Sequence, residues 1–346
     1  MRNAIGILEV RTTDRRDFLK TGLLAGGALA AGDRLRTLLS TGEAQAVAPK
    51  AARSRIVIAR DERLRPGGKS LDPDRVLDLL DRAMMSYFDR DDPVEPWKMV
   101  VRPDEVVGLK INCLAGRGNS TSVELVNAVC ERLQHAGVPA ENIVVWDRLN
   151  RDLEKGGYKI SYEGRGVKFF GNDALGFEQE LSAYGSVGSL LCRTLTRVCD
   201  CVINMPVIKD HSIAGVTVAL KNMFGAIHNP NKYHLTVGDP YIPDVYKLPQ
   251  VRNKIRLIVC DATTVQYEGG PSYLPHWAWA FDGLIVGKDP VALDHTGWKL
   301  IERKRSQEGM QSLEELDRKP TYLDTAADPK HKLGTNDPNR IDLIEV

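Results

Sequence analysis

Short continuous apolar runs recur along the chain, separated by glycine, proline and charged residues. Apolar runs of this length predict strands that are buried on both faces. We expect such strands at 56–59, 106–112, 143–147, 167–170, 201–208, 254–260, 283–287 and 341–344. Apolar residues at helical spacing predict helices at 72–85, 122–135, 187–198, 216–227 and 290–304.

The order of these elements predicts an α/β fold. Residues 106–112, 122–135 and 143–147 form a β-α-β unit of the length that a right-handed crossover between parallel strands requires. We therefore expect a mostly parallel sheet flanked by helices, of the doubly wound type, with loop-rich insertions. Residues 148–185 are rich in glycine and charge, and only the strand at 167–170 can be assigned there.

The N-terminus has the features of an export signal. The sequence Arg15-Arg16-Asp17-Phe18-Leu19-Lys20 precedes a mildly apolar stretch, and Ala44-Gln45-Ala46 suits a cleavage site. This pattern is typical of a twin-arginine signal, and the alternative is an amphipathic helix with chance arginines. It predicts transient contact with the twin-arginine translocase and a periplasmic or other extracytoplasmic location.

This signal sets the expected domain limits. We assign residues 1–46 to the signal, 47–54 to a linker and 55–346 to a single α/β domain. The apolar run of the signal is about ten residues, well short of the ~20 that span a bilayer, so no stable transmembrane helix is expected.

Composition narrows the function classes. The net charge is +1 and the basic residues are spread along the chain, so we expect no nucleic-acid or anionic-membrane surface. Of the six cysteines, Cys192 and the pair Cys199 and Cys201 lack the spacing of a zinc or iron–sulfur site. Cys130 and Cys260 lie in apolar elements that are typical of buried thiols, and neither a disulfide framework nor a ferredoxin-type cluster motif is predicted.

Polar side chains gather where three predicted strands end, which is where open α/β sheets bind ligands. The first loop carries Lys110 and Asn112, followed by a glycine-bearing segment ahead of a helix, where backbone N–H groups favour an anion. Its Gly-Arg-Gly matches neither the dinucleotide fingerprint nor the P-loop, so nucleotide binding is not supported.

The second loop connects the strand at 201–208 with the helix at 216–227 and carries Lys209 and His211. On that helix Thr217, Lys221 and His228 would share one face, and a solvated polar face is the alternative interpretation. The third loop begins at Asp261, which could be a metal ligand, an acid–base group or a cap. Capping explains Asp289 but leaves Asp294, five residues further, without a role.

Several short motifs occur together: Val107-Gly-Leu-Lys110-Ile-Asn112, Lys209-Asp-His211, Ala219-Leu-Lys-Asn222-Met-Phe-Gly225, His234, Gly269-Gly-Pro271 and Asp289-Pro-Val-Ala-Leu-Asp294. They resemble the family called domain of unknown function 362 over about residues 100–300. Some members of that family carry a ferredoxin-like iron–sulfur segment, and this chain lacks its cysteine runs. The resemblance implies a site and names no reaction.

Two functions are compatible with this sequence. The first is an exported enzyme, or an exported binding protein with an enzyme-like pocket. Lysine, histidine and aspartate side chains at the strand carboxyl ends would line this pocket and bind a small anionic ligand. Its catalytic candidates are His211, Lys221 and His234, and its ligand-binding candidates are Lys110, Asn112, Lys209, Asn222 and Asp261. A divalent metal held by His211, His234 and Asp261 is a variant, and no cofactor is otherwise indicated. The second function is a redox accessory, or a protein associated with an iron–sulfur or metal cofactor, that has no catalysis of its own.

Overall fold

The apolar runs of the chain form the middle of a mixed, mostly parallel sheet. The computed structural model describes residues 53–68 and 70–346. Ten strands in this part form one sheet: eight follow the order β12-β1-β11-β10-β7-β2-β3-β4, β8 also pairs with β10, and β9 pairs with β8. The expected α/β fold is therefore confirmed. The strands are β1 (Ser54–Arg60), β2 (Val107–Lys110), β3 (Ile143–Asp147), β4 (Lys168–Gly171), β5 (Ser182–Tyr184), β6 (Val187–Ser189), β7 (Cys201–Asn204), β8 (Val207–His211), β9 (Gly215–Thr217), β10 (Ile255–Gln266), β11 (Ala278–Gly287) and β12 (Ile341–Glu345).

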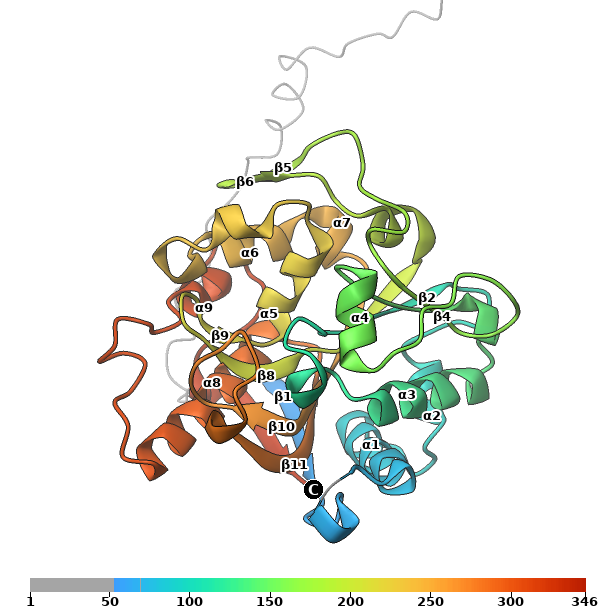
Figure 1. The fold of residues 1–346 in the computed structure, drawn as a ribbon, viewed down its shortest axis with the longest axis horizontal. Helices are drawn as coiled ribbons and strands as arrows, with labels where there is room; N and C mark the ends of the chain where they lie inside the picture. The colour runs from blue at the N-terminus through green and yellow to red at the C-terminus, as the bar shows by residue number, and fades with distance from the viewer. Residues whose placement is uncertain (1–52, 69) are drawn as a thin grey trace, which may run out of the picture. The chain divides into compact units, whose positions relative to one another are not determined.

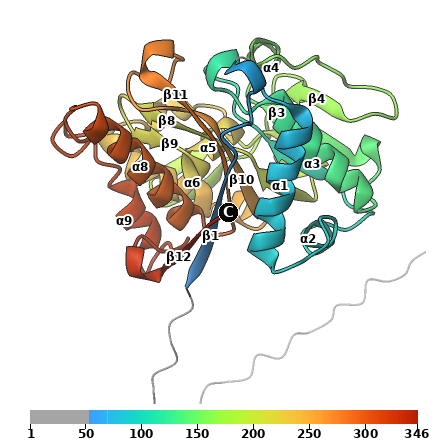
Figure 2. The ribbon, with the colours of Figure 1, turned by 90° about the horizontal axis from the view of Figure 1, so that it is seen from below.

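Helices cover both faces of this sheet, as Figures 1 and 2 show. They are α1 (Pro73–Phe88), α2 (Glu95–Lys98), α3 (Val123–His135), α4 (Asn150–Gly156), α5 (Ala219–Asn222), α6 (Tyr241–Lys247), α7 (Pro249–Arg252), α8 (Pro290–Gln307) and α9 (Tyr322–Ala327). In Figure 2, α1 and α3 lie on one side of β1 and β10, and α8 and α9 lie on the other.

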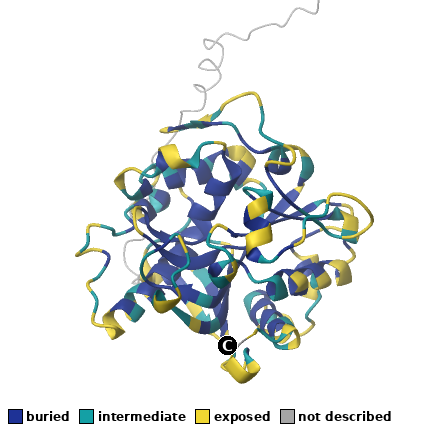
Figure 3. Cartoon of the chain, in the orientation of Figure 1, coloured by how far each residue is buried: buried dark blue, intermediate teal, exposed yellow. Residues whose placement is uncertain are grey.

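Two hydrophobic cores fill the space between the helices and the sheet. Successive residues of β10 alternate between them: Leu257 and Val259 pack with α1 and α3, whereas Ile258 and Cys260 pack with α8. Because both faces of these strands are buried, their sequences are unbroken apolar runs. The central elements are accordingly dark blue in Figure 3. All six cysteines are buried and unbridged.

Several elements confirm the sequence pattern in detail. Strands β2 and β3 are parallel neighbours joined through α3, as the β-α-β unit predicts. The side chain of Asp72 accepts the backbone N–H groups of Asp74 and Arg75 at the start of α1, and Asp289 caps α8 in the same way. The aspartate-proline pairs therefore mark true helix starts.

The single strand expected at 201–208 is two strands. Pro206 lacks an N–H group and separates β7 from β8. The long strand β10 pairs with β7 over its first residues, and further on it pairs with β8, where Asp261 lies opposite Val207 and Gln266 opposite Lys209. The prediction that Lys209 and His211 lie in a loop was therefore wrong, because both belong to β8.

The prediction of a helix at 216–227 is also wrong for most of these residues. Residues Gly215–Thr217 form β9, which pairs with β8, and only the short helix α5 and a 3-10 turn at Met223–Ala226 follow it. Thr217 and Lys221 consequently do not share a helix face with His228, which is exposed and packs against Phe177. Pairing with β8 outweighs the helical spacing of the apolar residues.

The helix expected at 187–198 is likewise replaced. Strands β5 and β6 form a small separate hairpin, whose two-residue turn uses the positive φ of Gly185, and a short π-helix spans Thr194–Val198. The hairpin lies beside α6 (Figure 1).

The expected export signal lies outside the described residues. Within residues 53–68 and 70–346, no helix is both long and apolar enough to cross a membrane.

Candidate functional site

A cavity of about 340 Å³ opens at the carboxyl ends of β2, β3 and β8. Those strands run in the same direction, so their last side chains meet at one edge of the sheet. The cavity brings together most of the predicted site residues, namely Lys110, Asn112, Lys209, His211, Lys221, Asn222 and His234. Asp261 does not line it.

The ammonium group of Lys110 is fully engaged by the protein. Its Nζ donates to the carbonyl oxygen of Ile111 at 2.6 Å, to Asp147 Oδ1 at 2.8 Å and to Asn222 Oδ1 at 3.2 Å. A lysine has three N–H donors, so none remains for a ligand. Lys110 is therefore a structural cation at the cavity wall rather than a ligand donor.

Gly225 permits this ion pair to form. A Cβ atom at Gly225 would lie 2.7 Å from Lys110 Cε, 2.8 Å from Lys110 Nζ and 3.1 Å from Asp147 Oδ1. Any side chain at this position would displace the buried pair. The glycine of the Leu-Lys-Asn-Met-Phe-Gly segment is thus required by close packing.

Asn222 connects three elements around the cavity. Its Oδ1 accepts from Lys110 Nζ and from Asn112 Nδ2, at 3.0 Å for the latter. Its Nδ2 donates to the carbonyl oxygen of Lys110 at 3.2 Å and to Asn204 Oδ1 at 2.7 Å. These four bonds use the hydrogen-bonding capacity of the amide, so Asn222 positions its neighbours and has little left for a ligand.

Lys209 and Lys221 differ from Lys110 because each has a single hydrogen-bond partner. Lys209 Nζ donates to Asn112 Oδ1 at 3.0 Å, and Lys221 Nζ lies 3.0 Å from His234 Nε2. Both side chains are buried, and neither forms an ion pair with a carboxylate of the described residues. Burial lowers the pKa of Lys209 to about 8 and that of Lys221 to about 7; the charge of Lys209 adds to the effect on Lys221.

Hydrogen bonding assigns the protonation of both histidines. His234 Nδ1 lies 3.0 Å from the carbonyl oxygen of Pro230 and must donate to it, so Nε2 accepts from Lys221. His211 Nδ1 accepts the backbone N–H groups of Ile213 and Ala214, so its neutral ring carries the proton on Nε2. That Nε2–H has no partner among the described residues.

Both rings are uncharged near neutral pH. Burial and the charge of Lys221 lower the pKa of His234 to about 4 and that of His211 to about 2. The rings stack with their centroids 5.3 Å apart. Two neutral imidazoles beside two lysines leave the cavity with an excess of positive charge.

Three further residues at the cavity were not singled out as site candidates. Asp147 ends β3, Arg148 follows it, and Asn231 lies in the 3-10 turn Pro230–Tyr233 just before His234. The strand-end argument that found Lys110 applies equally to Asp147, so that signal was present in the sequence. The hydroxyl of Thr217 is buried in the cavity wall and has no hydrogen-bond partner in the part of the chain that the structure describes.

Asp261 has a structural role away from the cavity. One carboxylate oxygen accepts the backbone N–H and the hydroxyl of Ser122, and the other accepts both donors of Thr263. The metal triad of His211, His234 and Asp261 is therefore not assembled. Within the described residues, no group of three histidine, cysteine, aspartate or glutamate side chains could hold a metal ion.

Asp294, to which the sequence assigned no role, holds the start of the helix that carries Lys221. It is fully buried in α8, and its Oδ1 accepts the backbone N–H groups of Ala219 at 2.7 Å and Leu220 at 3.3 Å. It thereby caps α5, the helix that carries Lys221. Both aspartates of the Asp289-Pro-Val-Ala-Leu-Asp294 motif are therefore caps, Asp289 of α8 and Asp294 of α5.

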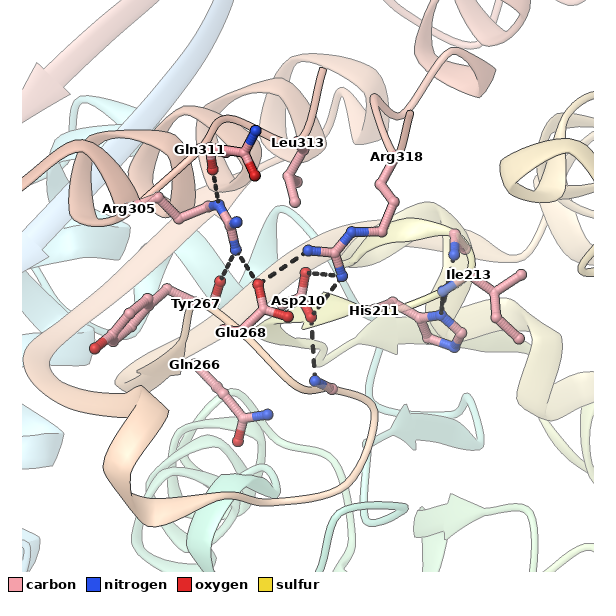
Figure 4. A network of polar contacts seen from close by, with 12 residues as sticks. Asp210, His211, Ile213, Gln266, Tyr267, Glu268, Arg305, Gln311, Leu313 and Arg318 are labelled. Carbon is pink, nitrogen blue, oxygen red and sulfur yellow. Dashed lines mark hydrogen bonds and ion pairs between the residues drawn. The ribbon is translucent and has the colours of Figure 1, made fainter. Parts of the chain in front are cut away.

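An ionic network holds the other face of β8 (Figure 4). Asp210 faces away from Lys209 and His211, and it contacts Arg318, which also binds Glu268. Burial raises the pKa of Asp210 to about 6, although Arg318 opposes the shift. Gly270 packs so tightly on the carbonyl oxygen of Asp210 that a Cβ atom would lie 1.8 Å from it. The network anchors the strand that presents Lys209 and His211.

A search of curated proteins found no match. Among solved structures, a crystal structure of a protein from Thermotoga maritima matches with a TM-score of 0.40 and 13% identity, covering 69% of this chain and 60% of the other. The lactate racemase apoprotein from Thermoanaerobacterium thermosaccharolyticum matches with a TM-score of 0.40 and 9% identity, covering 71% and 57%. This chain thus spans less than two thirds of either structure.

The family comparison covers more than half of the chain. Residues 107–299 match the family model for the domain of unknown function DUF362. This range includes the cavity, the Leu-Lys-Asn-Met-Phe-Gly segment and Asp294. The chain belongs to the DUF362 family.

Proposed function

We propose that this protein binds a small anionic ligand in the cavity, with Lys209 and Lys221 as its main charge partners. The observation that carries the proposal is the contrast between the lysines. Lys110 has Asp147 and two further acceptors, whereas Lys209 and Lys221 each have one neutral partner. An ammonium group buried without a carboxylate costs several kcal/mol, and an anionic ligand would remove that cost.

The other lining residues fit the same ligand class. Arg148 adds a positive charge, and the Nε2–H of His211 is a further donor. The Thr217 hydroxyl has no hydrogen-bond partner within residues 53–68 and 70–346. Asp147 is the acidic side chain of the lining, and Lys110 already pairs with it. A volume of about 340 Å³ suits a small metabolite.

Calorimetry tests the proposal. The full-length chain is titrated with propionate, pyruvate and inorganic phosphate, and at least one of them is expected to bind saturably. Lys209→Met and Lys221→Met should each weaken that binding about tenfold or more, because a hydrogen bond to a charged group contributes about 1.5–3 kcal/mol.

The control is Lys98→Met. Lys98 is an exposed residue of α2 that pairs with Glu95, so its loss should leave anion binding unchanged. The proposal fails if none of the three anions binds, or if binding persists in both cavity variants.

A further inference from the structure

We propose that Lys221 forms an imine with a carbonyl compound that carries an anionic group, either a carboxylate or a phosphate. This inference rests on the anion binding proposed above and adds a covalent step to it.

Lys221 is placed as a nucleophile in a way that the other two lysines are not. Lys110 is held by three acceptors, and Lys209 is the more deeply buried of the remaining pair and donates to an amide oxygen. Lys221 reaches the cavity from α5, and its partner is His234 Nε2, an unprotonated ring nitrogen whose lone pair faces the amine. A neighbouring base and the absence of a carboxylate both favour the neutral, nucleophilic amine.

The surroundings of Lys221 also favour loss of its proton. The burial of the side chain and the nearby charges of Lys209 and Arg148 lower the pKa of Lys221 to about 7. A substantial fraction of the amine is therefore neutral at physiological pH.

The step balances without an oxidant or reductant. The Lys221 nitrogen bonds to the carbonyl carbon, the carbon–oxygen bond breaks, and both amine protons leave with the oxygen as water. His234 Nε2, at 3.0 Å, is placed to take a proton from nitrogen and return it to the departing oxygen. Its Nδ1 bond to Pro230 keeps Nε2 available as that acceptor.

Two unpaired donors suit the carbonyl oxygen, and one cation suits the anionic group. The His211 Nε2–H and the Thr217 hydroxyl both lack partners among the described residues and could donate to the oxygen as charge develops on it. The Lys209 ammonium group, fixed by Asn112, would hold the carboxylate or phosphate.

Reductive trapping tests the imine. The full-length protein is incubated with pyruvate or with glycolaldehyde phosphate in the presence of cyanoborohydride, digested, and mapped by mass spectrometry. One reduced adduct on Lys221 is expected, and comparison of the two probes distinguishes a carboxylate from a phosphate substrate. Excess propionate should slow the labelling by occupying the same anion site.

The variants separate chemistry from accessibility. Lys221→Arg keeps the positive charge but has no amine that can form an imine, so the adduct should disappear, whereas Lys98→Arg should retain it. Labelling spread over exposed lysines, or undiminished by propionate, overturns the inference.

The two proposals fail differently. If calorimetry shows that pyruvate or phosphate binds and no adduct forms on Lys221 with either probe, the imine is rejected and anion binding stands. If no anion binds, the proposed function fails and the imine fails with it.

Discussion

At the scale of single residues, three lysines of the same cavity have three different hydrogen-bond environments. Hydrogen-bond partners decide the difference: Lys110 has Asp147, Lys209 has an amide and Lys221 has an imidazole. Only the last two retain N–H groups for a ligand. Residue type alone would treat them as equivalent.

The amide of Asn222 should matter for stability as well as for the site. Asn222→Ala is expected to lower the free energy of unfolding by about 2–4 kcal/mol, because four hydrogen bonds are lost and Lys110 and Asn204 are left with buried unpaired groups. Urea unfolding of the variant and the wild type measures this difference.

Asn142→Ala is the matched control, because Asn142 contributes a backbone N–H bond to Pro139 that alanine retains. A loss below about 1 kcal/mol for Asn222→Ala would mean that the network relaxes around the missing amide.

At the scale of elements, the cavity depends on a short hairpin and a short helix that are held from outside. Strands β8 and β9 present Lys209, His211 and Thr217, and Asp210 anchors β8 from its other face. The four-residue helix α5 is too short to be stable alone and is capped by Asp294 from α8. These contacts keep the polar side chains at the carboxyl ends of the strands.

Close packing at Gly225 gives a prediction for this group of elements. Gly225→Ala should lower the free energy of unfolding by about 1–3 kcal/mol, because the new methyl group overlaps Lys110 and its pair with Asp147. Gly188→Ala is the comparison, since nothing lies within 4 Å of a Cβ atom there. Equal stability of the two variants in chemical denaturation would contradict this account of the motif glycine.

At the scale of the whole molecule, the buried lysines couple folding to pH. The pKa of Lys209 falls from 10.5 to about 8 on folding and that of Lys221 from 10.5 to about 7. Between about pH 7 and 10.5 the unfolded chain therefore binds more protons than the folded chain. The free energy of unfolding should rise with pH in that window, and the gain is lost as the pH falls towards 7.

The Lys221→Met variant measures how much Lys221 contributes to this pH dependence of the free energy of unfolding. The variant should be more stable than the wild type at pH 7, on the order of 1–4 kcal/mol, because a buried charge is replaced by an apolar side chain. The advantage should shrink as the pH approaches 10. Denaturation curves at several pH values measure it, and a constant difference between variant and wild type would exclude a depressed pKa at Lys221.

Sequence by itself was sufficient for features that depend on local chemistry. Apolar runs buried on both faces identify β3 and β10, and aspartate-proline pairs identify the starts of α1 and α8, because capping involves residues two and three positions apart. Polar residues at the ends of such runs predict that Lys110 and Lys209 lie at one edge of the sheet, since parallel strands end there, and both line the cavity.

Tertiary structure decided what depends on partners far along the chain. Residues 216–227 have helical spacing, yet β8 pairs with their first part and Asp294, 75 residues after Ala219, caps the next. The loop predicted to begin at Asp261 is wrong, because pairing with β8 and β11 extends β10 to Gln266. The carboxylate of Asp261 accepts the hydroxyl and N–H groups of Ser122 and does not line the cavity. Whether a buried lysine is paired or available is likewise set by groups from other strands, because a charge in a low-dielectric interior responds to every neighbour within a few ångströms.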